Sequence, residues 1–172
     1  DHAGVLVALS GGPDSVALLD LARRWADQKQ RPVMAAHFNH QLRDLAGQAD
    51  EDFCRELCRR LDVPLHVGSG DVRGLARQRR RGLEEAGRTL RQRFLEAVRG
   101  EHDLAAIATG HHRDDQVETV LMRLFRGTGA QGLRGLRRRR DRLIRPLLQH
   151  DRIAVMEHLA AMNLSWREDA SN

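Results

Sequence analysis

The most constraining feature of this sequence is an apolar run that ends in a turn of serine and glycine and continues directly into a helical pattern. Val5 to Leu9 form the run, residues 10–15 (SGGPDS) form the turn, and apolar residues then recur at helical spacing as far as Ala22. This order predicts a buried strand, a glycine turn and a helix. Glycines let the backbone approach an anion, and amides at a helix N-terminus attract negative charge. The turn is therefore a candidate phosphate-binding loop.

The alternation of strand and helix continues along the chain. We expect further strands at 33–38, 65–67 and 104–109, helices at 50–61, 83–98 and 153–162, and a short apolar segment at 143–148. We interpret residues 68–82 as an irregular or partly helical connector and residues 126–142 as a long loop. Parallel strands need crossover connections, so the pattern predicts one α/β domain over 1–172: a doubly wound, mainly parallel sheet with helices on both faces.

A group of acidic residues follows the strand expected at 104–109. The turn Gly110 to Arg113 leads into a helix opened by Asp114 or Asp115, and Glu118 comes three residues after Asp115. At this spacing the acids project from one rim of the helix toward the carboxyl ends of the strands, where ligands bind in such folds. They can cap the helix, or bind Mg²⁺ or an amine beside a triphosphate. One buried stripe is expected on this helix, formed by Val117, Val120, Leu121, Leu124 and Phe125.

Several ordered segments carry a resemblance to a known family. The pattern S-G-G-x-D-S at 10–15 resembles the PP-loop of the ATP pyrophosphatase family. The segments that resemble the tRNA(Ile)-lysidine synthetases of that family are 37–43 (HFNHQLR), 82–91 (GLEEAGRTLR), 109–119 (TGHHRDDQVET), motifs within 126–148 and the closing 168–172 (EDASN). Two positions depart from the usual pattern, since Gly87 replaces an alanine and Gln92 an aromatic residue.

This resemblance implies a ligase that uses ATP and Mg²⁺ and forms AMP. Because the sequence shows neither a secretory signal nor a membrane-spanning run, we expect the protein to be cytoplasmic. The implied partners are tRNA(Ile) with a cytidine wobble base and free L-lysine. The C2 oxygen of the cytidine attacks the α phosphorus of ATP, and the ε-amine of lysine then displaces AMP to give lysidine. Such proteins carry further helical domains for tRNA binding, so we expect the 172 residues to be one part of a longer protein. A homodimer is left open.

Resemblance and side-chain chemistry together assign roles to individual residues. Nucleotide contacts are expected from Ser10, Gly11, Gly12, Asp14, Ser15, His37, His40, Gly110 and His111. Catalytic roles are expected for Asp14, Arg88, Asp115, Glu118 and Arg145. Substrate contacts are expected from Glu84, Arg91, Asp115, Glu118 and Arg145. The expected Mg²⁺ ligands are Asp14 and Asp114.

Arginine supplies almost all of the positive charge, which permits binding of nucleic acid. The chain has 29 basic and 24 acidic residues, a net charge of +5, and Lys29 as its single lysine. Candidate tRNA phosphate contacts are Arg77, Arg79, Arg80 and Arg81, and then Arg134, Arg137, Arg138, Arg139, Arg140 and Arg142. Solvated loops would show the same composition. Because tyrosine is absent and aromatic residues are few, reading of unpaired bases by stacking is not supported.

Four alternatives remain beside this interpretation. A tRNA thiolase of the same PP-loop group would need reactive cysteines, but Cys54 and Cys58 are one helical turn apart and are expected to be buried structural thiols on a distal helix. A non-catalytic ATP-binding regulatory domain would share the fold. A domain that binds nucleic acid through arginine alone leaves the glycine turn unexplained. A zinc site is the competing interpretation of His37, His40, His111 and His112, but no cysteine ligand is placed near them.

No apolar run approaches the roughly 20 residues that cross a bilayer.

Overall fold

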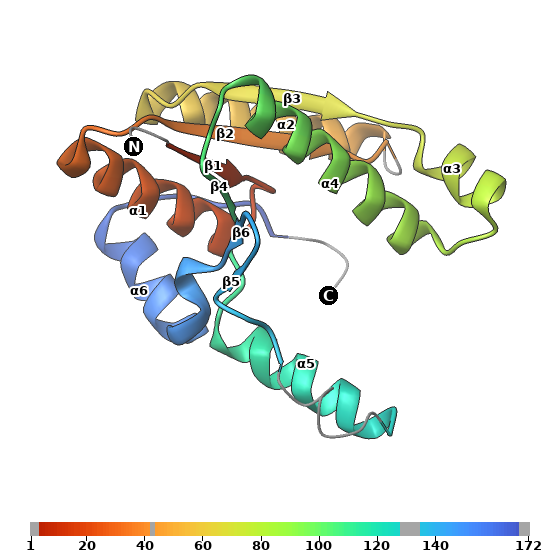
Figure 1. Cartoon of the computed structure of the whole chain (residues 1–172). Coiled ribbons are helices and arrows are strands. Elements are labelled where there is room, and N and C mark those ends of the chain that lie inside the picture. Colours follow the sequence, from red (N-terminus) through yellow and green to blue (C-terminus); the bar gives the residue numbers. More distant parts are fainter. Residues whose placement is uncertain (1–3, 42–43, 128–134, 169–172) are drawn as a thin grey trace.

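A six-stranded sheet forms the centre of the chain, with strand order β3-β2-β1-β4-β6-β5 (Figure 1). The computed structural model describes residues 4–41, 44–127 and 135–168. The strands are β1 (Val5–Ala8), β2 (Val33–Asn39), β3 (Leu65–Ser69), β4 (Ala106–Ala108), β5 (Arg139–Arg140) and β6 (Leu143–Ile144). All neighbouring pairs are parallel except β5 with β6. The predicted doubly wound, mainly parallel class is confirmed.

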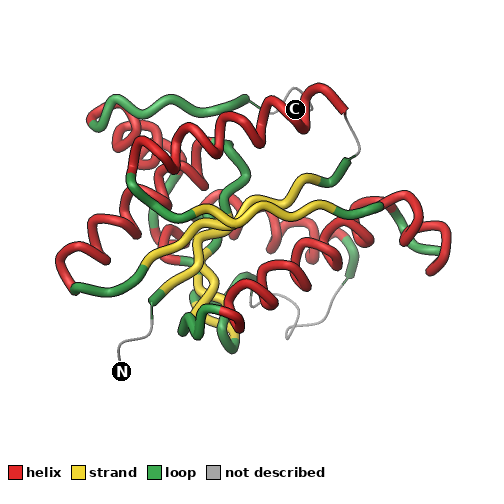
Figure 2. The backbone as a smooth tube through the Cα atoms, turned by 90° about the horizontal axis from the view of Figure 1, so that it is seen from above, coloured by secondary structure: helices red, strands yellow, loops and turns green. Residues whose placement is uncertain are grey.

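Helices cover both faces of this sheet (Figure 2). They are α1 (Pro13–Lys29), α2 (Asp44–Leu61), α3 (Val72–Arg79), α4 (Leu83–Glu101), α5 (Arg113–Phe125) and α6 (Arg152–Ala161), with a 3₁₀ turn, η2, at Pro146–Gln149. Side chains of successive β1 residues point to opposite faces. Val5 and Val7 pack with α1, α2 and α6, whereas Leu6 packs with α4. Burial on both faces explains why β1 is an uninterrupted apolar run.

The order of the strands places the site. The chain runs from β1 outward to β2 and β3, and then returns to the other side of β1 to form β4. At such a reversal the connections after neighbouring strands leave toward opposite faces, which opens a crevice at the carboxyl ends of the strands. The loop 10–15 follows β1 and the turn 110–112 follows β4, so both reach this crevice.

The region after α5 departs from the sequence prediction. The expected long loop at 126–142 contains β5, which pairs with β6 in an antiparallel hairpin. The apolar segment at 143–148 is divided between β6 and η2. The strand expected at 104–109 is shorter, at 106–108, and the connector at 68–82 contains α3. Thr128, Gly129, Gly132, Leu133 and Arg134 lie outside the described residues.

The predicted buried stripe on α5 is wrong. Val117 is 52% exposed, Leu121 45%, Leu124 56% and Phe125 85%, and no residue of α5 is buried. Figure 1 shows the reason, because α5 leaves the body of the domain after its first turns. Helical periodicity therefore identified an apolar face that no other described part of the chain covers. Within the described residues, no helix is long and apolar enough to span a membrane.

This exposed face gives a testable consequence for stability. We expect Phe125→Ser to change the free energy of unfolding by less than about 0.5 kcal/mol, because no packing is lost. Leu159→Ala is the control, since Leu159 on α6 is fully buried in the core cluster that includes α1, and it should cost about 2–5 kcal/mol. Urea unfolding of both variants measures the difference. A loss above about 2 kcal/mol in Phe125→Ser would show that α5 is packed in solution.

Candidate active site

The turn after β1 is organised by one buried hydroxyl. Ser15 Oγ accepts hydrogen bonds from the backbone amides of Ser10 at 3.1 Å and Gly11 at 3.2 Å, and it donates to the carbonyl of Gly12 at 2.9 Å. Ser15 thus holds the loop closed from within, while Ser10 lies exposed at its mouth. Gly12 is the N-cap of α1, and the first amide to bond back along the helix is that of Val16. The amides of Asp14 and Ser15 precede it at the positive end of the helix dipole.

The two glycines of this loop differ in what they contribute. Gly11 has φ of +93°, a conformation that other residues rarely adopt. Its carbonyl accepts a hydrogen bond from the amide of Arg167 at 2.9 Å, which ties the C-terminal segment to the loop. Gly12 has an ordinary extended conformation, and a Cβ there would meet only Ser10 Oγ, at 3.6 Å. Gly11 is therefore required for the backbone, whereas Gly12 leaves open space before the helix N-terminus.

Gly110 brings the second turn against the first. A Cβ at Gly110 would lie 2.9 Å from the carbonyl carbon of Asp14, closer than side chains can approach backbone. Glycine therefore lets the β4–α5 turn contact the start of α1. The structure therefore shows a packing role for Gly110, and the expected contact between Gly110 and the nucleotide remains a prediction.

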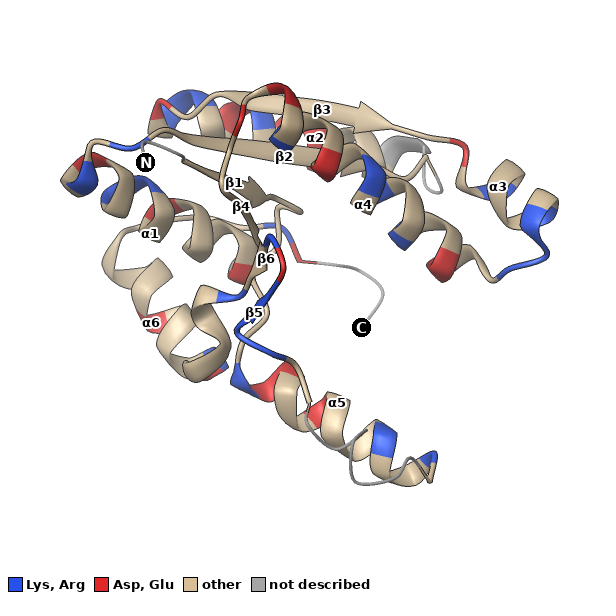
Figure 3. Cartoon of the chain, viewed as in Figure 1, with Lys and Arg blue, Asp and Glu red and all other residues tan. Residues whose placement is uncertain are grey.

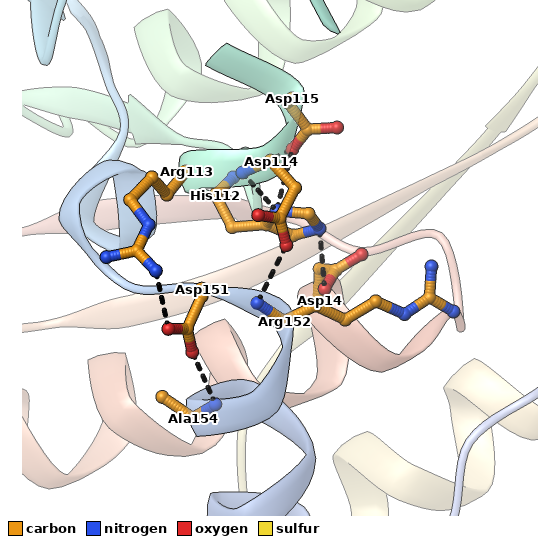
Figure 4. Close-up of polar contacts among 8 residues, drawn as sticks. All are labelled: Asp14, His112, Arg113, Asp114, Asp115, Asp151, Arg152 and Ala154. Carbon is orange, nitrogen blue, oxygen red and sulfur yellow. Dashed lines mark hydrogen bonds and ion pairs between the residues drawn. The ribbon is translucent and has the colours of Figure 1, made fainter. Parts of the chain in front are cut away.

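His112 and Asp115 cap α5 reciprocally. His112 Nδ1 accepts from the amide of Asp114 at 3.2 Å, and Asp115 Oδ2 accepts from the amide of His112 at 2.7 Å. The other ring nitrogen of His112 lies 3.5 Å from Asp14 Oδ1 (Figure 4). His112 is not among the residues expected from the sequence to bind nucleotide or substrate or to take part in catalysis. Its position immediately before the helix was the available signal, because such positions supply N-caps.

Asp114 and its neighbour Arg113 join α5 to α6 (Figure 4). Asp114 Oδ2 accepts from the amide of Arg152 at 3.0 Å, and Arg113 pairs with Asp151 at 2.7 Å. Asp151 in turn caps α6 by accepting from the amide of Ala154 at 2.9 Å. One Asp114 oxygen is thus occupied at the interface, so Asp14 is the better placed of the two expected metal ligands.

A hollow of about 630 Å³ opens beside these acids. Its acidic lining is Asp14, Asp114, Asp115 and Glu118, its apolar lining is Val117, Leu121, Met122 and Phe125, and His112 and Arg152 complete it. We name it the acidic pocket. Of the expected acids, Glu118 is exposed and lines the pocket, and no hydrogen bond or ion pair to another described residue accounts for its position. An acidic wall beside aliphatic side chains suits a cation on an apolar stem.

Asp14 has the features of a cation ligand. Its side chain lines the acidic pocket, and its Oδ1, which faces His112, is buried with no hydrogen-bond partner among the described residues. Burial raises the pKa of Asp14, the facing His112 opposes this rise, and Asp115 adds to it. In the described ranges, no three His, Cys, Asp or Glu side chains come close enough to hold a metal ion by themselves. Mg²⁺ commonly uses one or two carboxylates together with phosphate oxygens, so Asp14 fits a cation that arrives with a triphosphate.

Positive charge gathers on the other side of the loop. His111 is held by Thr109 Oγ1 at 2.9 Å. Burial and then the charge of Arg145 lower its pKa, Asp115 opposes this fall, and Arg91 and Arg88 add smaller decreases. Burial, then Arg140 and Arg88, lower the pKa of Arg145, whose Nε is buried without a partner in the described structure. Figure 3 shows basic residues on α4 and around β5 and β6. The expected residues Arg88, Arg91, His111 and Arg145 therefore form one cationic group, suited to an anion.

A second hollow, of about 350 Å³, lies between the ends of β1 and β2. We name it the β1–β2 pocket. His37 and His40 both line it, although His37 Nδ1 is occupied by the carbonyl of Leu9 at 3.0 Å. Burial and the charge of Arg91 lower the pKa of His40. A Cβ at Gly87 would come within 3.0 Å of His40 Nδ1, so glycine at this unusual position leaves room for the ring.

Glu84 and Cys54 do not lie where the sequence predicted. Glu84 is exposed in the first turn of α4 and lines neither pocket. Cys54 is not distal, because a Cβ on Gly11 would lie 3.5 Å from its Sγ, and that Sγ is 3.4 Å from His37 Nδ1. Both cysteines are buried, as predicted, and burial raises the pKa of each thiol to about 12.

Comparison with known proteins places these features in a family. The family model of the PP-loop domain matches residues 1–172. tRNA(Ile)-lysidine synthase from Chlorobaculum tepidum is 42% identical over 98% of this chain and 51% of the relative, and that from Clostridium acetobutylicum is 37% identical over 98% and 37%. The chain thus spans about half or less of these relatives. The U34-tRNA thiolase NcsA from Methanococcus maripaludis has a similar fold, with a TM-score of 0.78, 19% identity and coverage of 98% of this chain and 60% of NcsA.

The different roles of the two loop glycines can be tested separately. We expect Gly11→Ala to lower the free energy of unfolding by about 1 kcal/mol, because alanine is strained at positive φ. Gly12→Ala should leave unfolding nearly unchanged and weaken binding of pyrophosphate, because its methyl group occupies the space before the helix amides. Thermal unfolding and calorimetric titration with pyrophosphate measure the two effects. Unweakened pyrophosphate binding by Gly12→Ala would contradict the assignment of this space to an anion.

Proposed function

Because this chain belongs to the PP-loop domain family, we propose that it is the ATP-binding catalytic domain of a tRNA(Ile)-lysidine synthase. In this reaction the wobble cytidine of tRNA(Ile) is adenylated by ATP, and L-lysine is then joined to it. The names and the 37–42% identity of the relatives over nearly the whole chain support the proposal. tRNA and free lysine meet in the cytoplasm, where we expect the protein to act.

One observation carries the proposal: the glycine loop contributes Ser10 to the β1–β2 pocket, which Arg91 also lines, and leads into Asp14, which lines the acidic pocket. The α phosphorus needs positive charge around its oxygens while it is attacked, whereas the second substrate, lysine, brings a cationic side chain. A kinase or simple ATPase has no need for an acidic pocket with an apolar wall beside the nucleotide. The two oppositely charged surfaces therefore fit a reaction with an anionic and a cationic substrate.

The first step is an attack by the cytidine C2 oxygen on the α phosphorus of ATP. A new O–P bond forms, the bond to the β-phosphate breaks, and pyrophosphate leaves. Backbone amides at the start of α1 receive the pyrophosphate, and Arg88, Arg91, His111 and Arg145 offset the charge on the α-phosphate. Such transfers depend on positioning and charge neutralisation more than on covalent help from the protein. Asp14 would hold Mg²⁺, which when bound neutralises charge on the phosphates.

The second step is an attack by the ε-amine of lysine on C2 of the activated cytidine. The bound ammonium first gives up a proton, to a carboxylate of the acidic pocket or to solvent, so that the amine can attack. A C–N bond forms, the C–O bond to AMP breaks, and a second proton leaves the nitrogen for solvent to give lysidine. Asp115 Oδ1 and Glu118 are the groups proposed to hold the lysine ammonium in the acidic pocket. Arg145 is proposed to pair with the lysine carboxylate, since its forked donors match that shape. We propose that the adenosine part of ATP binds in the β1–β2 pocket.

Contacts with tRNA are proposed for the exposed arginines. Arg77, Arg79, Arg80 and Arg81 surround the end of α3, and Arg137, Arg138, Arg139, Arg140 and Arg142 surround the β5–β6 hairpin. Their exposure leaves the guanidinium groups accessible to phosphates. The rest of the anticodon is expected to be recognised by other parts of the protein.

A tRNA thiolase and a regulatory ATP-binding domain both account for the site less well than a lysidine synthase does. A thiolase that used its own cysteines would need thiolates, but Cys54 and Cys58 are buried and have pKa values of about 12. The likeness to NcsA concerns the fold. A regulatory ATP-binding domain would leave Glu118 and the acidic pocket without a purpose.

Separate assays of the two half-reactions test the proposal in the full-length protein. Asp14→Ala should reduce tRNA-dependent ATP–pyrophosphate exchange on the order of a hundredfold. Glu118→Ala should retain part of the exchange but lose incorporation of labelled lysine, because only the second step uses the ammonium. Asp115→Ala is a poorer test, since its carboxylate also caps α5. Equal loss of both half-reactions in Glu118→Ala would contradict the amine-binding role.

The lowered pKa of His111 predicts how ATP binding depends on pH. A bound triphosphate offsets the positive charge of Arg145 and should raise the pKa of His111. Binding then takes up a proton between the free and bound pKa values, so affinity for ATP increases as the pH falls through that window. Calorimetry from about pH 8 to about pH 5.5 measures this slope. His111→Asn should flatten it, and an unchanged slope in that variant would place the phosphates away from His111.

A further inference from the structure

His112 is the buried residue that connects the two turns of the site. Its side chain is 7% exposed and comes from the N-cap of α5, yet its ring also faces the loop after β1 (Figure 4). An N-cap is ordinarily served by a shorter side chain such as serine or aspartate. The imidazole reaches farther, so its second nitrogen lies against Asp14.

The cap determines which ring nitrogen carries the hydrogen. Nδ1 lies 3.2 Å from the amide nitrogen of Asp114, which can only donate. The nearest carboxylate oxygens to Nδ1, from Asp115 and Asp114, are 3.6 and 3.7 Å away, too far for hydrogen bonds. Nδ1 is therefore the acceptor, and the ring hydrogen lies on Nε2.

The hydrogen on Nε2 faces one oxygen of Asp14. Nε2 lies 3.5 Å from Oδ1, and Oδ1 is buried with no hydrogen-bond partner in the described parts of the chain. A shift of a few tenths of an ångström would close this contact, and such bonds often shorten when a ligand binds. A carboxylate held through one oxygen keeps its other oxygen free for a ligand, and Asp14 lines the acidic pocket.

We propose that His112 is a positioning residue, whose Nε2–H orients Asp14 so that the second carboxylate oxygen meets a divalent cation bound together with the β- and γ-phosphates. This inference rests on the proposed function of Asp14. It separates His112 from its neighbour His111, which lies in the cationic group. Groups that orient a metal-binding carboxylate typically change metal affinity by about 10- to 100-fold when they are removed.

Two substitutions separate capping from positioning. In His112→Asn, Oδ1 takes the place of Nδ1 and asparagine is a favoured N-cap, but no atom reaches the place of Nε2. In His112→Gln, the side-chain amide nitrogen takes the place of Nε2, whereas the cap is weakened. A capping role alone predicts that Asn is tolerated and Gln is not. Positioning of Asp14 predicts the reverse for cation-dependent binding.

The measurement is calorimetric titration with ATP in Mg²⁺ and with ATP in EDTA, together with thermal unfolding of each variant. We expect His112→Asn to weaken Mg·ATP binding about tenfold or more, with ATP binding in EDTA unchanged. His112→Gln should remain within about threefold of the wild type, even if its unfolding temperature falls. Mg·ATP binding by His112→Asn at wild-type strength, or equal weakening in both variants, would overturn the inference.

A cycle with Asp14→Asn distinguishes this inference from the proposed function. If His112 acts through Asp14, adding His112→Asn to Asp14→Asn should cause no further loss of Mg·ATP affinity. Full additivity would overturn the inference while leaving the role of Asp14 intact. Wild-type affinity in Asp14→Asn alone would refute the role of Asp14 and, with it, the inference.

Discussion

The site depends on the contact between two helix N-termini that follow neighbouring parallel strands. α1 begins after β1 and α5 begins after β4, and the missing side chain of Gly110 lets the second turn touch the backbone of Asp14. Helix N-termini favour anions, so two of them at one crevice create a place for a polyphosphate. Asp14 and the caps of α5 then bring carboxylates to the edge of that place. The opposite charges come from different elements, because the carboxylates lie at the starts of α1 and α5, whereas the arginines lie on α4 and directly after β6.

The same residues that shape the crevice also hold the domain together. Ser15 closes the loop after β1, Asp115 closes the first turn of α5, and Asp114 joins α5 to α6. Residues in such motifs therefore serve the backbone first and a ligand through their remaining atoms. Gly12 and Glu118 are different, because the described structure gives neither a packing role. They are the positions where loss of function without loss of stability is most expected.

Periodicity and turn chemistry predicted the fold well, because β1 is buried on both faces and the glycine turn leads directly into α1. The sequence also predicted a site at the carboxyl ends of the strands, where ligands of parallel sheets lie, and this remains a prediction. Two features could not be predicted from the sequence. The apolar stripe of α5 has the same pattern whether it is covered or exposed, and only the direction of the helix decides between them. The contact of His112 with Asp14 joins residues far apart in sequence, so spacing along the chain carries no sign of it.

The central claim is that the turn after β1 binds the phosphates of ATP between the cationic group and the acidic pocket. A crystal structure with Mg²⁺ and an ATP analogue that cannot be cleaved between the α- and β-phosphates tests it most directly. The account predicts the β- and γ-phosphates on the amides at the start of α1, with the cation on Asp14 and the α-phosphate facing Arg145. A triphosphate bound elsewhere, or a start of α1 covered by side chains with no space for an anion, would contradict it.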